Sequence, residues 1–217
     1  MIERMLPAVA VTLGVTLFLG VGGARRDPSA VDRKAAPAVA ADPARPGLDA
    51  SSALPAGSLY DLGLKVVGTD GRTRPLDDWR GHPVLASMFF ASCPTACPLL
   101  INDLQRLEAA LPADLREETR VLLVSFDPKR DSPAVLEGVV GQHGLDSRRW
   151  RVVAAENEDS ARLLAAALGI RYRAAAWGMF DHTVRVAVLD GSGRIRARSG
   201  DVMALAPAQR AAPSTRE

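Results

Sequence analysis

The sequence predicts a layered α/β domain. Two observations support this prediction: apolar runs typical of buried strands alternate with helical patterns, and a hairpin pattern follows the last helix. Turn and cap residues separate the segments, which gives each element a defined start and end. Because alternating strands and helices usually form a sheet covered by helices, we expect a central mixed β-sheet flanked by helices.

The predicted elements lie within residues 58–204, which we interpret as one folded domain. A turn at residues 68–71 predicts a hairpin of residues 64–67 and 72–74. The remaining predicted elements are, in order, a buried strand at 82–90, a helix from about 97 to 111 that Pro112 ends, a strand at 121–126, a helix from Pro133 capped by Ser132 and ended by Gly144, a strand at 150–154, a helix at 158–168 closed by Gly169, and a hairpin of 184–190 and 194–199. This order is compatible with a thioredoxin-like sheet.

Three other segments lie outside this domain. Residues 5–23 carry no charge and approach the roughly 20 apolar residues that cross a bilayer, so residues 1–26 predict a membrane anchor or a cleaved signal segment. Residues 27–57 are rich in alanine and proline and predict an extended tether. Residues 205–217 predict a flexible tail. We therefore expect the domain outside the cytoplasm, in the periplasm if the source is a bacterium, either anchored or released.

Composition limits the classes of function. The formal net charge is +2, which is too small to indicate a nucleic-acid partner. The chain has only two cysteines, Cys93 and Cys97, and two cysteines cannot form a disulfide scaffold. They are therefore interpreted as reactive or metal-binding residues.

The cysteine pair lies in the motif FFASCPTACP, residues 89–98, where the buried strand gives way to the helix. Backbone N–H groups at a helix N-terminus favour negative charge and should lower the pKa of a thiol. Residues four apart on a helical turn lie on one face, about 6 Å apart along the axis. Two thiolates at that separation can share a metal or bond to each other. Thiolates are soft ligands that select Cu(I), zinc or iron–sulfur clusters, but two alone leave zinc under-coordinated.

A third ligand has to come from elsewhere, and the chain has three histidines. His82 precedes the buried strand, at the end opposite the cysteines. His143 lies at a helix C-terminus, where a cation is favoured. His182 lies in a loop before the next strand, and in a thioredoxin-like sheet that loop faces the start of the helix that carries the cysteines. The predicted metal site is therefore Cys93, Cys97 and His182.

Several motifs together resemble the Sco/SenC family of copper chaperones for cytochrome c oxidase assembly. The run LDDWRGHPVL at 76–85 is similar to the family's entry into the active-site strand, and CPTACP at 93–98 is similar to its copper motif. The runs VSFDP at 124–128 and DSP at 131–133 resemble its second signature. DHT at 181–183, followed by Leu189-Asp190 and Gly193, resembles its histidine loop. The chain after Met203 is too short and too rich in proline and alanine for the terminal helix of the family.

The resemblance implies a thioredoxin-like fold and a copper site made of Cys93, Cys97 and His182. The cargo would be Cu(I), with Cu(II) as a second oxidation state, and the partner would be the CuA-bearing subunit of the oxidase, with other copper chaperones as further partners. Asp127 matches an acid that the family has near the site. It is a candidate for metal exchange or redox chemistry, and a turn-capping carboxylate is the alternative.

Two other functions compete with copper delivery. A thiol–disulfide oxidoreductase would use Cys93 and Cys97 as its redox pair to reduce an exported partner, although motifs of the thioredoxin type have two intervening residues and this one has three. A peroxidase would need an activated thiolate beside a cation, and residues 89–100 contain neither arginine nor lysine. Copper delivery involves no catalytic turnover. We therefore expect enzymatic activity only if the protein acts as a thiol–disulfide oxidoreductase.

Overall fold

The structure is a computed structural model that describes residues 57–212 and residue 214. The strands are β1 (Lys65–Val67), β2 (Thr73–Pro75), β3 (Val84–Phe89), β4 (Arg120–Ser125), β5 (Trp150–Ala155), β6 (Tyr172–Ala174), β7 (Phe180–His182), β8 (Val186–Leu189) and β9 (Ile195–Ser199). The α-helices are α1 (Ala96–Ala109), α2 (Ala113–Glu118), α3 (Pro133–His143), α4 (Glu158–Leu168) and α5 (Ala206–Ala211). Short 3-10 helices are η1 (Leu59–Leu62), η2 (Ala176–Gly178) and η3 (Met203–Leu205).

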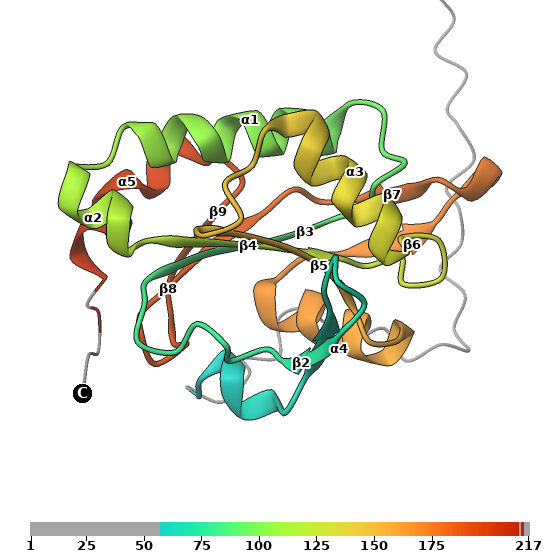
Figure 1. Ribbon diagram of the computed structural model, residues 1–217, viewed down its shortest axis with the longest axis horizontal. Coiled ribbons are helices and arrows are strands. Elements are labelled where there is room, and N and C mark those ends of the chain that lie inside the picture. Colours follow the sequence, from blue (N-terminus) through green and yellow to red (C-terminus); the bar gives the residue numbers. More distant parts are fainter. Residues whose placement is uncertain (1–56, 213, 215–217) are drawn as a thin grey trace, which may run out of the picture. The chain divides into compact units, whose positions relative to one another are not determined.

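Seven strands form one mixed sheet in the order β2-β1-β5-β4-β3-β8-β9. The three central strands β3, β4 and β5 run parallel, and the strands on either side pair antiparallel. Helices α1 and α3 cover one face of the sheet and α4 covers the other (Figure 1). The prediction of a mixed sheet flanked by helices is therefore confirmed.

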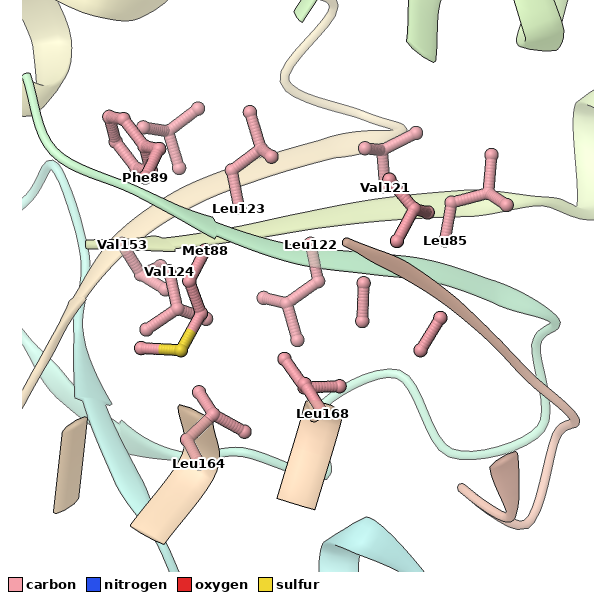
Figure 2. Close-up of a cluster of buried hydrophobic side chains, with 14 of the residues drawn as sticks. Leu85, Met88, Phe89, Val121, Leu122, Leu123, Val124, Val153, Leu164 and Leu168 are labelled. Carbon is pink, nitrogen blue, oxygen red and sulfur yellow. The ribbon is translucent and has the colours of Figure 1, made fainter. Parts of the chain in front are cut away.

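The core lies on both faces of β3 and β4, and every residue of β3 is buried. Successive side chains of a strand point to opposite faces. Figure 2 shows the consequence: Met88 and Val124 point towards Leu164 and Leu168 of α4, whereas Phe89 points to the other side of the sheet. Burial on both faces explains why β3 reads as a continuous apolar run, and it fixes the position at which the chain leaves the sheet towards α1.

The predicted helix boundaries match the structure closely. The Ser132 hydroxyl accepts a hydrogen bond from the Val135 N–H at the start of α3, which has proline at its first position. Gly144 and Gly169 end α3 and α4 in the left-handed conformation. These local signals therefore place both helices correctly.

Membrane attachment remains a prediction. No helix among the described residues is long and apolar enough to cross a bilayer. The predicted anchor and nearly all of the predicted tether lie outside the described residues.

Several elements of the structure were not expected from the sequence. Residues after Pro112 form the short helix α2, and the segment before His182 forms a two-stranded ribbon of β6 and β7. The flexible tail predicted from residue 205 is wrong for the described part, because residues 206–211 form α5. The Gln209 side chain is fully buried and its Nε2 donates a 2.8 Å hydrogen bond to Thr119 Oγ1. This buried polar contact, which no local pattern reveals, fastens the terminal helix to the segment before β4.

Glu108 offers a test of the core because its buried carboxylate accepts hydrogen bonds from two other side chains. It accepts 2.7 Å and 3.0 Å hydrogen bonds from Arg149 Nε and Trp150 Nε1, which connect α1 to the start of β5. We predict that Glu108→Ala lowers the free energy of unfolding by about 2 kcal/mol, because it leaves the buried Trp150 N–H without an acceptor and removes the shortest ion pair of Arg149, which keeps Glu117 and Asp146. Glu108→Gln should lower it less, since an amide oxygen still accepts one bond. Urea unfolding followed by circular dichroism measures both, and equal losses would contradict this account.

Candidate metal centre

Three donor side chains meet at the end of β3 that leads into α1. The sulfur atoms of Cys93 and Cys97 and a ring nitrogen of His182 all lie within 4.8 Å of one another. Both cysteines are free and buried, with 8% and 3% of their surface exposed, and His182 is half-buried. No other group of three or more histidine, cysteine or acidic side chains with such proximity occurs in the described part of the chain. The structure thus brings together the three residues predicted as ligands.

The start of α1 places the two sulfur atoms. The helix begins at Ala96, so Cys97 lies in its first turn and Cys93 lies in the loop before it, rather than both on one helical face as expected. The N-cap residue Thr95 makes no side-chain capping bond. Instead the Cys97 N–H donates to Cys93 Sγ at 3.3 Å. The Cys93 sulfur therefore satisfies one of the unpaired N–H groups that every helix start leaves.

The same geometry separates the pKa values of the two thiols. Burial raises the pKa of Cys93, but hydrogen bonds from the backbone of Thr95, Cys97 and Ala96 stabilise the thiolate and leave its pKa lowered overall. Burial raises the pKa of Cys97 well above its usual range, and the neighbouring Cys93 adds to this effect. Cys93 is thus the thiolate-forming member of the pair, whereas Cys97 keeps its proton at neutral pH until a metal or a sulfur replaces it.

His182 is held by the ribbon and by aromatic rings. It ends β7, where it pairs with Tyr172 of β6. Its ring centroid lies 5.7 Å from that of Phe90 and 5.4 Å from that of Phe126, edge-on to the first. Phe180, two residues earlier on the same strand, packs 5.2 Å and 5.1 Å from the same two rings. Contacts of this kind orient the imidazole towards the cysteines.

One ring nitrogen of His182 supports a metal-binding role directly. Its Nδ1 atom is buried and has no hydrogen-bond partner among the described residues. Buried polar atoms are nearly always satisfied, so an unpaired one in a group of potential ligands calls for an external partner. The donor set of two sulfur atoms and one imidazole therefore fits a metal ion with a low coordination number.

Asp131 positions the cysteine loop, a role that sequence reasoning did not assign. Its buried carboxylate accepts a 2.9 Å hydrogen bond from the Ala91 N–H, two residues before Cys93. It also accepts one from the Ser125 hydroxyl at the end of β4. Burial raises the pKa of Asp131. The carboxyl group thus connects the loop after β3 to the loop after β4.

Asp127 lies close to this connection but is not one of the three donors. Its backbone N–H donates to Ser125 Oγ at 3.0 Å, and its buried carboxylate forms an ion pair with Arg130. The Arg130 guanidinium in turn lies 5.4 Å from the ring centroid of Phe180. Asp127 therefore holds an arginine against the histidine-bearing ribbon, while its proposed action on the metal stays a prediction.

The other two histidines do not belong to the three-donor group, as expected. His143 ends α3, and its carbonyl accepts a 3.0 Å hydrogen bond from Gln105 Nε2. His82 precedes β3, and its N–H donates to the Trp79 carbonyl at 3.1 Å. His82 thus stabilises a turn and His143 the end of a helix, each through a backbone group.

The pKa difference between the two thiols predicts their reactivity. In the reduced protein, iodoacetamide should modify Cys93 first, with a rate that rises with pH around a midpoint below the ordinary thiol value of 9.0. The rate rises because deprotonation produces the reactive thiolate. Cys97 should react only slowly over the same range, since its raised pKa and burial keep it protonated. Peptide mass spectrometry at several times and pH values measures both rates. In urea the two rates should converge, and equal rates in the folded protein would contradict the assignment.

Comparisons with known proteins find similar sequences and similar folds. A protein of Stutzerimonas stutzeri, named as a proposed copper-binding protein, is 27% identical over 154 residues, which are 69% of this chain and 74% of that protein. The structure of BsSco, described as a Sco-family cytochrome c oxidase assembly protein with a disulfide switch, has a TM-score of 0.59 at 18% identity and covers 68% of this chain and 90% of its own. Copper-bound ScoI of Bradyrhizobium japonicum has a TM-score of 0.57 at 15% identity, over 69% of this chain and 96% of its own.

These structural matches confirm the predicted thioredoxin-like α/β fold. The SCO1/SenC family model matches residues 58–211, which include all three donor residues and nearly all of the described chain. The chain therefore belongs to the SCO1/SenC family.

Proposed function

We propose that this protein binds Cu(I) as cargo through Cys93, Cys97 and His182 and delivers it to the CuA centre of a cytochrome c oxidase subunit. The observation that carries the proposal is the convergence of two sulfur atoms and one imidazole nitrogen within 4.8 Å. Soft thiolates select Cu(I), whereas zinc prefers four ligands and only three are gathered at this place among the described residues. The copper-binding relatives and the assembly role named for BsSco support both the metal and its destination.

The site also has features that suit release of the metal. Cys93 and His182 are its two more accessible donors, and Cys97 is the most deeply buried. In a ligand-exchange reaction, donors of an acceptor protein replace first the accessible ligands of the carrier. Cys97, the most deeply buried donor, would then be the last ligand to be replaced, and its raised pKa would return it to the thiol form once the metal has left. The apolar run at residues 5–23 supports delivery outside the cytoplasm, from an anchored or an exported protein.

A thiol–disulfide oxidoreductase is the second candidate function, and the pKa difference favours it. Cys93 has the lowered pKa of an attacking thiol, and the free thiol of Cys97 lies close enough to resolve a mixed disulfide. A partner disulfide would be reduced to two thiols while Cys93 and Cys97 become a disulfide. BsSco is described as having a disulfide switch, which supports this chemistry at a similar fold.

Copper titration tests the first function and separates it from the second. We predict that the reduced full-length protein binds one Cu(I) per chain under anaerobic conditions. Cys93→Ser and Cys97→Ser should lose stable binding, and His182→Ala should bind at least about 10-fold more weakly, because each removes one of only three donors. Competition with a chromogenic Cu(I) chelator gives the affinities.

His143→Ala is the matched control, since it removes a histidine that lies outside the three-donor group. Its Cu(I) affinity should equal that of the wild type. Unchanged binding by His182→Ala would contradict the three-ligand site. Failure of the wild-type protein to hold copper, together with rapid and reversible disulfide formation, would favour the oxidoreductase.

A further inference from the structure

Trp177 is the most exposed large apolar residue of the described chain. Its relative exposure is 98%, compared with 58% for Leu99, the next in rank. The two other tryptophans, Trp79 and Trp150, are buried. Burial of an indole is favourable, but the Trp177 side chain lies in water and gains nothing from it. Packing within this chain therefore does not explain why a tryptophan occupies this position.

The local backbone does not favour tryptophan at this position either. The Met179 N–H donates to the Ala176 carbonyl at 3.1 Å and closes a tight turn between β6 and β7. Its central residues, Trp177 (φ 61°, ψ 28°) and Gly178 (φ 70°), both have positive φ, as in a type I′ turn. This turn favours Asn-Gly, and Trp177 is the only residue other than glycine with positive φ in the described part of the chain. Trp177 at the tip of the ribbon thus combines an apolar side chain exposed to water with a backbone conformation that tryptophan rarely adopts. Residues with such locally unfavourable features cluster at functional sites.

The tip is held in place by Arg130. A Cβ atom at Gly178 would lie 2.2 Å from the Arg130 guanidinium, so the turn and the loop after β4 are in close contact. The same guanidinium lies over the ring of Phe180 and pairs with Asp127. The Arg130 contacts therefore hold the turn that carries the indole in one position. Less conformational entropy is then lost when a partner binds the indole.

The outer face of the ribbon, opposite the face that packs His182 against Phe90 and Phe126, is polar. Arg171, Arg173, Asp181 and Thr183 are all exposed on it, and with His182 they line a hollow of about 340 Å³. Arg173 pairs with Asp181 at 2.8 Å. No ion pair of the Arg171 side chain occurs among the described residues. Arg171 therefore leaves an uncompensated positive charge on this outer face of the ribbon.

We propose that Trp177 anchors a folded partner protein that presents an apolar recess bordered by carboxylates, and that Arg171 pairs with one of those carboxylates on the outer face of the ribbon. An exposed tryptophan and an arginine are the residue types that most often dominate the binding energy of protein interfaces. The inference rests on the proposed function, because the partner it names is the protein that receives the copper. Trp177 lies in the turn of the ribbon whose second strand ends at His182, so a partner docked on the indole contacts the element that carries one of the three donors.

A protein partner agrees with these observations better than a lipid surface does. The tip offers one large apolar side chain, flanked by Ala176 and Gly178, and the adjoining face includes the acidic Asp181.

The test measures binding of the copper-loaded full-length protein to the copper-free CuA-bearing domain of the oxidase subunit from the same organism. We predict that Trp177→Asn raises the dissociation constant at least about 10-fold. Its copper stoichiometry should be unchanged, and its Tm should be equal to or above that of the wild type, because Asn-Gly suits the turn. Arg171→Glu should also weaken binding, and more strongly at low salt. Leu163→Ala, which removes an exposed apolar side chain of α4, is the matched control and should leave the dissociation constant unchanged.

Each other outcome overturns the proposal in a distinguishable way. If the wild type binds and transfers copper but Trp177→Asn binds equally well, docking through Trp177 is wrong while copper delivery stands. If the copper-loaded wild type does not bind the acceptor domain at all, both this partner and delivery to the CuA centre are wrong. If Trp177 fluorescence shifts to the blue with phosphatidylglycerol vesicles in the absence of the acceptor, the tip is a membrane contact. If Trp177→Asn abolishes self-association of the wild type, the partner is a second copy of the chain.

Discussion

The start of α1 is the constraint on which the metal centre depends. Its unpaired N–H groups require an acceptor, and Cys93 Sγ accepts the N–H of Cys97. One interaction therefore sets the separation of the two sulfur atoms and stabilises the Cys93 thiolate. It also ends the loop that leaves β3, a strand buried on both faces that cannot shift without exposing the core. The chemistry of the cysteine pair thus depends on a strand that is buried along its whole length.

The third donor, His182, is positioned by a separate and smaller structural element. His182 lies on a ribbon of two three-residue strands that is not part of the seven-stranded sheet. Aromatic packing against Phe90 and Phe126 and the arginine held by Asp127 orient this ribbon. The Asp131 carboxylate meanwhile ties the cysteine loop to the end of β4. The two halves of the centre therefore meet through the loops after β3 and β4, where parallel sheets commonly place their ligands.

The sequence alone was informative wherever a feature is local. Apolar runs, helical patterns, the Ser132 cap and the Gly144 and Gly169 termini predict most elements, and the cysteine spacing together with a family resemblance predicts the donors. Contacts between distant segments were not predictable. Asp131 hydrogen-bonds to Ala91 across 40 positions, and Gln209 to Thr119 across 90, without any local signal. The unexpected ribbon has a related cause, because its short strands are stabilised mainly by aromatic rings from other elements. The turn at Trp177 breaks the local preference, so no turn rule could find it.

The central claim is that two sulfur atoms and one imidazole bind Cu(I). X-ray absorption at the copper edge of the reduced, copper-loaded protein tests it most directly, because the first coordination shell reports the type and number of ligand atoms. We predict two sulfur ligands and one nitrogen ligand in the wild-type protein, and loss of the histidine signal in His182→Ala while both sulfur ligands remain. A wild-type spectrum with sulfur ligands alone, unchanged by His182→Ala, would contradict the assignment of His182 and with it the three-donor centre.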